Sequence, residues 1–214
     1  VQIIDELDFT IFKENPKWIV GYSDVTVLHS HLNTLGYQSL HASMPINFQD
    51  NTEKAIASLK NSLFGKEIKY EISSHPLNRS GKGQGELIGG NLSILYSLLS
   101  SSSQVDFNGK ILFIEDLDEY LYHVDRMLMN FKRNQSLSQL KGIIIGGMTK
   151  MHDNEVPFGK SVEEIIFDAV KEYDFPICFN FPAGHLKDNQ AIQFGQSATL
   201  EVSEISTLNY GTTQ

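Results

Sequence analysis

Three residues that could perform nucleophilic chemistry are spread along the chain: Ser23, Glu115 and His185. Ser23 lies between a short apolar segment and a helix-forming pattern, in the sequence GYSD. A serine at a sharp strand-to-helix turn exposes its hydroxyl, and the amide that follows it, here that of Asp24, can donate to an oxyanion. Serine, acid and histidine also follow one another in an order known for catalytic triads. The three residues therefore indicate acyl transfer through a serine nucleophile.

Each of the three residues also has an ordinary structural interpretation. Serine before a helix is usually an N-cap, and the nucleophile pattern G-x-S-x-G is incomplete because Val25 occupies its last glycine position. Glu115 belongs to an acidic cluster and could be a solvated acid at the end of a strand. His185 could be a loop histidine. The residue types alone leave the triad as one of two interpretations.

Charge and hydropathy limit the classes of partner. The 214 residues include 17 Lys+Arg and 26 Asp+Glu, a formal net charge of −9, without a run of basic residues. This balance argues against a nucleic acid or an anionic membrane as partner, and it favours small-molecule or peptide chemistry. No apolar stretch is long enough to span a bilayer, and the first residues lack the features of a signal peptide.

Metal and cofactor chemistry have little support in the sequence. No H-E-x-x-H motif or comparable ligand spacing occurs. The single Cys178 lies in an apolar context, and we interpret it as a core thiol. The glycines of residues 73–85 match neither the P-loop nor the dinucleotide-binding pattern. We therefore predict a protein without metal or cofactor. Five further histidines lie near plausible sites: His29, His31, His41, His123 and His152.

Alternating strands and helices must position the candidate residues. Apolar runs predict strands near residues 18–20, 39–44, 66–72, 86–88, 110–114, 142–145 and 176–180, and helical periodicity predicts helices over residues 24–35, 52–64, 91–99, 119–131 and 161–173. This alternation predicts an α/β fold with a mostly parallel sheet, followed by an antiparallel tail from residue 191. Reactive groups collect past the carboxyl ends of such strands, where Glu115 and His185 stand.

The clearest change of composition lies at residues 73–85, SSHPLNRSGKGQG. Serine, glycine and proline dominate there and apolar residues are almost absent, which is typical of a linker. We place a domain boundary in this segment, so that residues 1–75 carry Ser23 and residues 76–214 carry Glu115 and His185. Just beyond it, the pair Gly89-Gly90 predicts a turn.

Five sequence blocks occur in a fixed order: GYSDVTVLH at 21–29, GELIGGNLSIL at 85–95, ILFIEDLDEYLYHVDRML at 111–128, GIIIGGM at 142–148 and FPAGHLKDNQAIQFGQSATL at 181–200. Together these blocks resemble the LD-carboxypeptidase family, and the similarity covers nearly the whole chain. In such proteins the Ser of the GxSD block, the Glu of the FxED block and the His of the GH block form the catalytic triad. The resemblance carries these roles to Ser23, Glu115 and His185, and we assign substrate binding to Gly90 and Asn91.

The resemblance also implies a fold and an activity. The expected fold is an incomplete Rossmann-like nucleophile domain followed by a swivelling β/α domain, with the triad assembled across the two. The implied activity is that of a cytoplasmic serine peptidase that removes the terminal D-alanine from a muropeptide tetrapeptide during cell-wall recycling. It cuts an L-to-D peptide bond without metal or cofactor. We expect a homodimer that acts on a muropeptide or short peptide, with no nucleic-acid or membrane partner.

Two other functions are compatible with the same blocks. One is a peptidase with the same triad that cleaves a peptide–nucleotide antibiotic, as self-immunity peptidases do. Such an enzyme needs an aromatic platform for the nucleobase, and Trp18, the single tryptophan, is already part of a predicted strand. The other is a non-catalytic module that binds muropeptides. We rank both below the carboxypeptidase.

Members of the family carry a further stretch before the GxSD block, which is expected to supply a second oxyanion donor. If the Asp24 amide is the only donor, the missing partner costs about 100- to 1000-fold in rate. We therefore predict that the 214-residue chain releases D-alanine much more slowly than a longer protein that contains it. The test is D-alanine release at equal concentration, with limited proteolysis over residues 18–35. Equal turnover and equal resistance would contradict the prediction.

Overall fold

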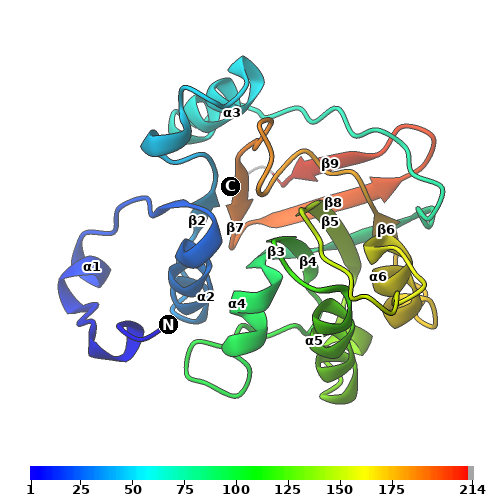
Figure 1. The fold of residues 1–214 in the computed structure, drawn as a ribbon. Coiled ribbons are helices and arrows are strands. Elements are labelled where there is room, and N and C mark those ends of the chain that lie inside the picture. Colours follow the sequence, from blue (N-terminus) through cyan, green and yellow to red (C-terminus); the bar gives the residue numbers. More distant parts are fainter. Residues whose placement is uncertain (212–214) are drawn as a thin grey trace.

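The computed structural model describes residues 1–211 and has a mixed α/β fold (Figure 1). Its strands are β1 (Val20–Gly21), β2 (Ser39–His41), β3 (Gly81–Asn91), β4 (Ile111–Leu117), β5 (Gly142–Thr149), β6 (Ile177–Cys178), β7 (Ile192–Phe194), β8 (Ser197–Val202) and β9 (Thr207–Tyr210). Its α-helices are α1 (Thr10–Glu14), α2 (Thr26–Thr34), α3 (Glu53–Leu63), α4 (Leu92–Ser97), α5 (Leu121–Arg133) and α6 (Val162–Val170). Short 3-10 helices are η1 (Ile4–Glu6), η2 (Ser23–Val25), η3 (Pro45–Asn47) and η4 (Leu137–Gln139).

The strands form two sheets. The larger sheet has the order β6-β5-β4-β3-β8-β9, in which β6 to β3 are parallel and β8 and β9 are antiparallel to their neighbours. The smaller sheet has the order β1-β2-β7, with β1 and β2 parallel and β7 antiparallel. The predicted α/β class, with parallel strands and an antiparallel tail, is confirmed. Because β7 belongs to the C-terminal segment, its pairing with β2 connects the N-terminal strands to the rest of the chain.

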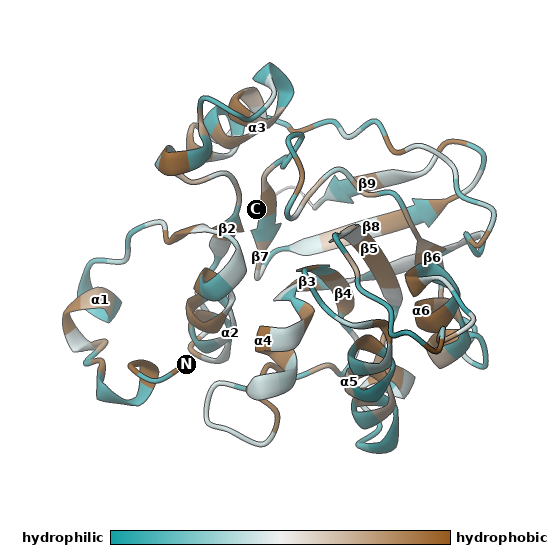
Figure 2. Cartoon of the chain, in the orientation of Figure 1, coloured by the Kyte–Doolittle hydropathy of each residue, from teal (hydrophilic) through white to brown (hydrophobic). Residues whose placement is uncertain are grey.

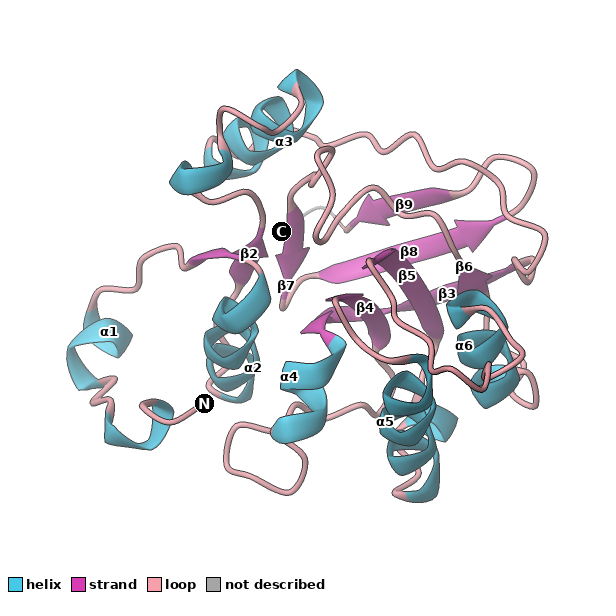
Figure 3. Cartoon of the chain, viewed as in Figure 1, coloured by secondary structure: helices cyan, strands magenta, loops and turns pink. Residues whose placement is uncertain are grey.

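The main core lies between the parallel strands and the helices on one face of the larger sheet (Figure 3). Strand β4 is buried along nearly its whole length and β5 over its first four residues, which is typical of parallel strands covered on both faces. They are among the most hydrophobic parts of the chain (Figure 2). Helix α5 buries Val124, Met127, Leu128 and Phe131, which recur at the spacing of one helical face.

Several predicted helix ends are also confirmed. Thr52 caps α3 by accepting from the Ala55 amide, and Ser161 forms a capping box with Glu164 at the start of α6. Gly36 follows α2 with a φ of +79°, the conformation typical of a residue just past a helix. Within residues 1–211, no helix has both the length and the hydropathy needed to span a membrane.

The predicted strand at residues 66–72 is wrong. Only Ile72 forms an isolated β-bridge, with Ser206, and the segment is otherwise an extended loop (Figure 3). Ile68 and Ile72 are nevertheless buried, because the loop lies against the sheets and uses these two side chains to pack. The apolar pattern therefore reflects packing rather than strand pairing.

The glycine-rich segment is only partly a linker, because residues 81–85 begin β3. The predicted turn at Gly89-Gly90 is also wrong, since both residues lie inside this strand. A Cβ at Gly83 would lie 1.9 Å from the Lys141 carbonyl oxygen, and one at Gly89 would lie 1.9 Å from the Phe113 carbonyl oxygen. Glycine is therefore required here for close approach of neighbouring backbone, not for a turn.

We predict that Gly89→Ala destabilises the protein by about 3 kcal/mol or more, because backbone on β4 blocks the added methyl group and φ is +142°. The matched control is Gly36→Ala, where φ is +79° and no atom lies within 4 Å of the added Cβ. This control should cost about 1 kcal/mol, from backbone strain alone. Urea unfolding of both variants measures the difference, and equal losses would contradict the role given to close approach.

Candidate active site

Ser23 occupies the sharp turn between β1 and α2. Its φ is +60°, a left-handed conformation that costs a non-glycine residue about 1 to 3 kcal/mol. The preceding Tyr22 is extended, and η2 begins at Ser23 itself. Within the described part of the chain, neither the Ser23 hydroxyl nor the Asp24 amide makes a hydrogen bond to another residue. The strained turn therefore leaves both groups available to a ligand.

A buried histidine supports the Ser23 turn. His29 Nε2 lies 2.9 Å from the Gly21 carbonyl oxygen, and His29 Nδ1 lies 2.8 Å from Ser39 Oγ. Burial lowers the pKa of His29 to about 3, although the hydrogen bond to Gly21 acts in the opposite direction. The ring is therefore neutral at pH 7, with Nε2 as donor to Gly21 and Nδ1 as acceptor from Ser39. The sequence predicts no role for His29, because nothing in a helical pattern distinguishes a histidine that makes this contact.

Glu115 and His185 form a hydrogen-bonded pair. Glu115 Oε2 accepts from His185 Nδ1 at 2.6 Å and from the His185 backbone amide at 3.1 Å. Glu115 lies within β4, rather than beyond its end, and is completely buried. The two contacts hold the imidazole in the tautomer with a proton on Nδ1, so that Nε2 is the nitrogen free to act as a base.

The pKa values of the two groups follow from this contact. Burial raises the pKa of Glu115, but the hydrogen bond from the His185 side chain and the nearby His41 imidazole outweigh it and lower that pKa to about 2. The carboxylate is therefore ionised at pH 7. Burial lowers the pKa of His185, while the hydrogen bond to Glu115 and the charges of Glu115 and Asp116 raise it, and the net shift is upward.

The loop that carries His185 is fixed by two neighbours. Gly184 has a φ of +106°, and a Cβ there would lie 2.7 Å from Glu115 Cβ and 2.8 Å from Glu115 Oε2. Any side chain at this position would therefore displace the carboxylate. Buried Asn189 accepts from the Gly184 amide at 2.9 Å. Asn189 is a second residue that sequence analysis missed, since its contact depends on how the loop folds.

The Ser23 turn lies beside the acid–histidine pair. The ring of Tyr22 packs edge-on against the His185 ring, with their centroids 4.8 Å apart. Thr26 Oγ1, one turn into the helical segment after Ser23, accepts from the Asn91 amide at 3.0 Å. No hydrogen bond joins Ser23 Oγ to His185 in the described chain. The structure thus brings Glu115 and His185 into contact and places Tyr22, the residue before Ser23, against the His185 ring.

Gly90 and Asn91 lie where β3 passes into α4. The Asn91 side chain caps α4 through the Ile94 amide and donates to Asp116 Oδ1 at 2.8 Å. Burial raises the pKa of Asp116 to about 6, against hydrogen bonds from Leu117, Asn91 and Ser93 that lower it. A Cβ at Gly90 would meet Thr26 Oγ1 at 2.5 Å. Both residues therefore have structural roles, and their assignment to substrate binding stays a prediction, as does the Asp24 oxyanion donor.

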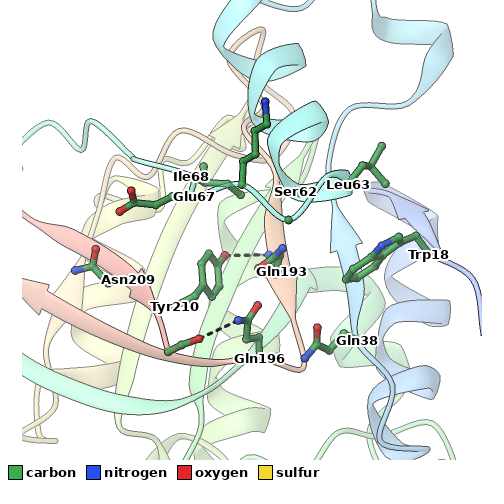
Figure 4. A pocket seen from close by; sticks show the side chains of 13 residues that line it. Trp18, Gln38, Ser62, Leu63, Glu67, Ile68, Gln193, Gln196, Asn209 and Tyr210 are labelled. Atoms are coloured by element: carbon green, nitrogen blue, oxygen red, sulfur yellow. Dashed lines mark hydrogen bonds between the residues drawn. The ribbon is translucent and has the colours of Figure 1, made fainter. Parts of the chain in front are cut away.

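A separate cavity of about 700 Å³ lies between the end of α3 and strands β7 and β9 (Figure 4). Its lining includes Trp18, Gln38, Gln193, Gln196 and Tyr210, and none of the three triad candidates. The Gln193 backbone N–H donates to the Tyr210 hydroxyl at 2.9 Å, so the Tyr210 hydroxyl in the lining already has a hydrogen-bond partner. Among residues 1–211, no three His, Cys, Asp or Glu side chains form a cluster that could hold a metal ion.

Two models of known protein families match the parts of the chain that carry the candidate site residues. The family model described as the LD-carboxypeptidase C-terminal domain matches residues 84–200, and the model of the N-terminal domain matches residues 1–42. The chain belongs to the LD-carboxypeptidase family. The C-terminal match alone covers more than half of the chain and contains both Glu115 and His185, while the N-terminal match contains Ser23.

Similar proteins include several carboxypeptidases. The chain is 34% identical over 205 residues to the "Probable murein peptide carboxypeptidase" of Bacillus subtilis (strain 168), covering 92% of this chain and 64% of that protein. It is 27% identical over 211 residues to the "Murein tetrapeptide carboxypeptidase" of Pseudomonas aeruginosa, covering 94% of this chain and 68% of that protein. The chain thus spans a little under two thirds of the length of the B. subtilis relative.

Solved structures show the same fold. The muramoyltetrapeptide carboxypeptidase from Oxalobacter formigenes has a TM-score of 0.87 at 24% identity, over 98% of this chain and 73% of that one. MccF, solved in complex with glutamyl sulfamoyl guanosine, has a TM-score of 0.82 at 20% identity, over 96% of this chain and 71% of that one. At this identity the likeness establishes the fold, and the chemistry has to be argued from the site.

We predict that Glu115→Gln lowers the pKa of His185 by about 1 to 3 units, because an amide has no charge to stabilise the imidazolium. Titration of the ring by NMR measures this shift. The matched control is Glu119→Gln, which alters a second carboxylate–histidine pair. In that pair, Glu119 Oε2 lies 2.5 Å from His123 Nδ1. This control should leave the pKa of His185 unchanged. An unaltered His185 titration in Glu115→Gln would contradict the electrostatic role of the pair.

Proposed function

We propose that this chain forms most of a serine carboxypeptidase that removes the terminal D-alanine from muropeptide tetrapeptides, by hydrolysis of an L,D-peptide bond in peptidoglycan recycling. The observation that carries the proposal is the buried, ionised Glu115 on His185 Nδ1, beside the strained turn of Ser23. The names of the murein peptide and murein tetrapeptide carboxypeptidases among the relatives support the substrate class.

In this proposal, Ser23 attacks the scissile carbonyl once its hydroxyl is within hydrogen-bond reach of His185 Nε2. His185 takes the hydroxyl proton, and Glu115 stabilises the imidazolium through Nδ1. The unpaired Asp24 amide donates to the oxyanion of the tetrahedral intermediate. His185 then gives the proton to the departing D-alanine amine, and water, deprotonated by the same histidine, hydrolyses the acyl-enzyme.

The substrate-binding role of Gly90 and Asn91 fits their place at the β3–α4 junction. The Asn91 amide contacts Thr26 Oγ1, so this junction lies against the helix that follows Ser23. The second N–H of the Asn91 carboxamide has no partner among the described residues, because Asp116 takes one of the two. We propose that this second N–H donates to a peptide carbonyl or carboxylate of the substrate.

The organisation of the whole enzyme is part of the same proposal. We place the boundary between nucleophile domain (1–75) and second domain (76–214) in the extended segment before β3, which lies between the two matched family domains. The enzyme acts in the cytoplasm as a homodimer on a muropeptide or short peptide, without nucleic acid or membrane as partner. The net charge of −9 is consistent with that choice of partner.

Cleavage of a peptide–nucleotide antibiotic is the second candidate. It is supported by similarity to the Escherichia coli "Microcin C7 self-immunity protein MccF", which is 26% identical over 65% of this chain. The B. subtilis relative is more similar and covers 92% of the chain. In addition, Trp18, the single tryptophan, lines the cavity away from His185. The carboxypeptidase function is therefore preferred.

We predict that Ser23→Ala lowers D-alanine release by roughly 10⁴-fold or more, because the nucleophile is lost. Release from a defined muropeptide tetrapeptide is followed by mass spectrometry, in this chain and in a longer protein that contains it. The control is Ser97→Ala, an exposed serine on α4 that should keep the parent rate. Release by Ser23→Ala near the parent rate would leave only a binding role for the site.

We predict that kcat/KM falls on the acid side with a midpoint above the ordinary histidine pKa of about 6.5. His185 must be neutral to accept the Ser23 proton, and its pKa is raised by Glu115, so the active form is lost as the pH drops through that raised value. A pH–rate profile measures the midpoint. A rate that stays flat from about pH 5 to 8, with chemistry shown to be rate-limiting, would contradict a histidine base.

A further inference from the structure

A second histidine faces the carboxylate oxygen that His185 leaves free. His41, at the end of β2, is completely buried, and neither of its ring nitrogens has a hydrogen-bond partner among the described residues. Glu115 Oε1 is also buried without a partner. His41 Nε2 lies 3.9 Å from Glu115 Oε1, within ion-pair range but too far for a hydrogen bond.

The surroundings of His41 make this contact important. The His41 ring packs against Phe113 and Phe194, with ring centroids 5.1 and 5.7 Å away. An unpaired carboxylate oxygen in such an apolar environment costs several kcal/mol. His29, whose ring centroid lies 6.3 Å from that of His41, already uses both its nitrogens on Gly21 and Ser39. His41 is therefore the polar group placed to compensate Oε1.

His41 also connects the two halves of the site. In the parallel pairing of β1 and β2, His41 is the register partner of Gly21, which lies two residues before Ser23. The same strand therefore fixes the backbone of the turn and places an imidazole next to Glu115. The Tyr22 ring, 6.1 Å from the His41 ring and 4.8 Å from the His185 ring, packs between these elements.

We propose that His41 is a positioning residue for Glu115: it donates from Nε2 to Oε1 and so holds the carboxylate in the orientation that presents Oε2 to His185. A shift of about 1 Å would bring the two atoms to hydrogen-bond distance. The carboxylate is then held on both oxygens, by His41 from β2 and by His185 from the loop after β6. The effect of His41 on catalysis rests on the proposed function, whereas its effect on the orientation of Glu115 does not.

The first test is the pKa of His185, measured by NMR titration in the 214-residue chain. His41→Leu should lower it by about one unit or more, because Glu115 loses the donor that orients it and keeps it ionised. His41→Gln, whose amide N–H can reach Oε1, should retain most of the parent value. Phe194→Leu is the control, since it removes a ring packed on His41 without removing a polar group, and it should not move the pKa. The other titratable groups facing these rings are Tyr22, His29 and Asp116.

The second test does not depend on the folding of a His41 variant. In Glu115→Gln, the ring-nitrogen resonances of His41 should shift, because their acceptor has changed. Unchanged His41 resonances there, or a parent-like His185 pKa in folded His41→Leu, would overturn the proposal. In a longer protein that releases D-alanine, His41→Leu should lower kcat by about 100-fold with little change in KM. Failure of the parent to release D-alanine would refute the proposed function, whereas the NMR result would still decide the role of His41.

Discussion

A buried negative charge is the constraint on which the rest of the site depends. Glu115 is completely buried in β4, and such a carboxylate stays ionised only if other groups compensate it. His185 supplies two N–H groups to one oxygen, and His41 lies 3.9 Å from the other. The pairing of β4 with β5 shifts register between Ile114 and Asp116, so the strand is irregular at the position of Glu115. Gly184 leaves room for the carboxylate because it has no side chain.

On the nucleophile side of the site, neighbouring residues stabilise the strained backbone conformation of Ser23. Ser23 has a positive φ, and the turn before it is fixed by His29 through the Gly21 carbonyl oxygen. Antiparallel pairing of β2 with β7 attaches this region to the C-terminal segment of the chain. The bond from the Asn91 amide to Thr26 attaches it to β3. A chain whose triad candidates lie in separate halves of the sequence thus holds them in one region.

Sequence alone predicted much of this arrangement, for physical reasons. The helices of Glu53–Leu63 and Val162–Val170 have both an apolar face and a capping residue, and these signals are local. The glycines of β3 misled the prediction, because glycine marks a turn in isolation but close backbone approach at Gly89. The contacts of His29 and His41 left no trace in the local sequence. His29 on α2 contacts β1 and β2, and His41 on β2 faces Glu115 on β4. A buried histidine has the same sequence signature as an exposed one.

The central claim is that His185 activates Ser23, and labelling by a fluorophosphonate tests it most directly. Peptide mass spectrometry of this chain, and of a longer protein that contains it, identifies the modified residue and its rate of modification. The account predicts label on Ser23, at a rate that rises with pH through the pKa of His185 and is lost in His185→Ala. Label on another residue, or an unchanged rate in His185→Ala, would contradict it.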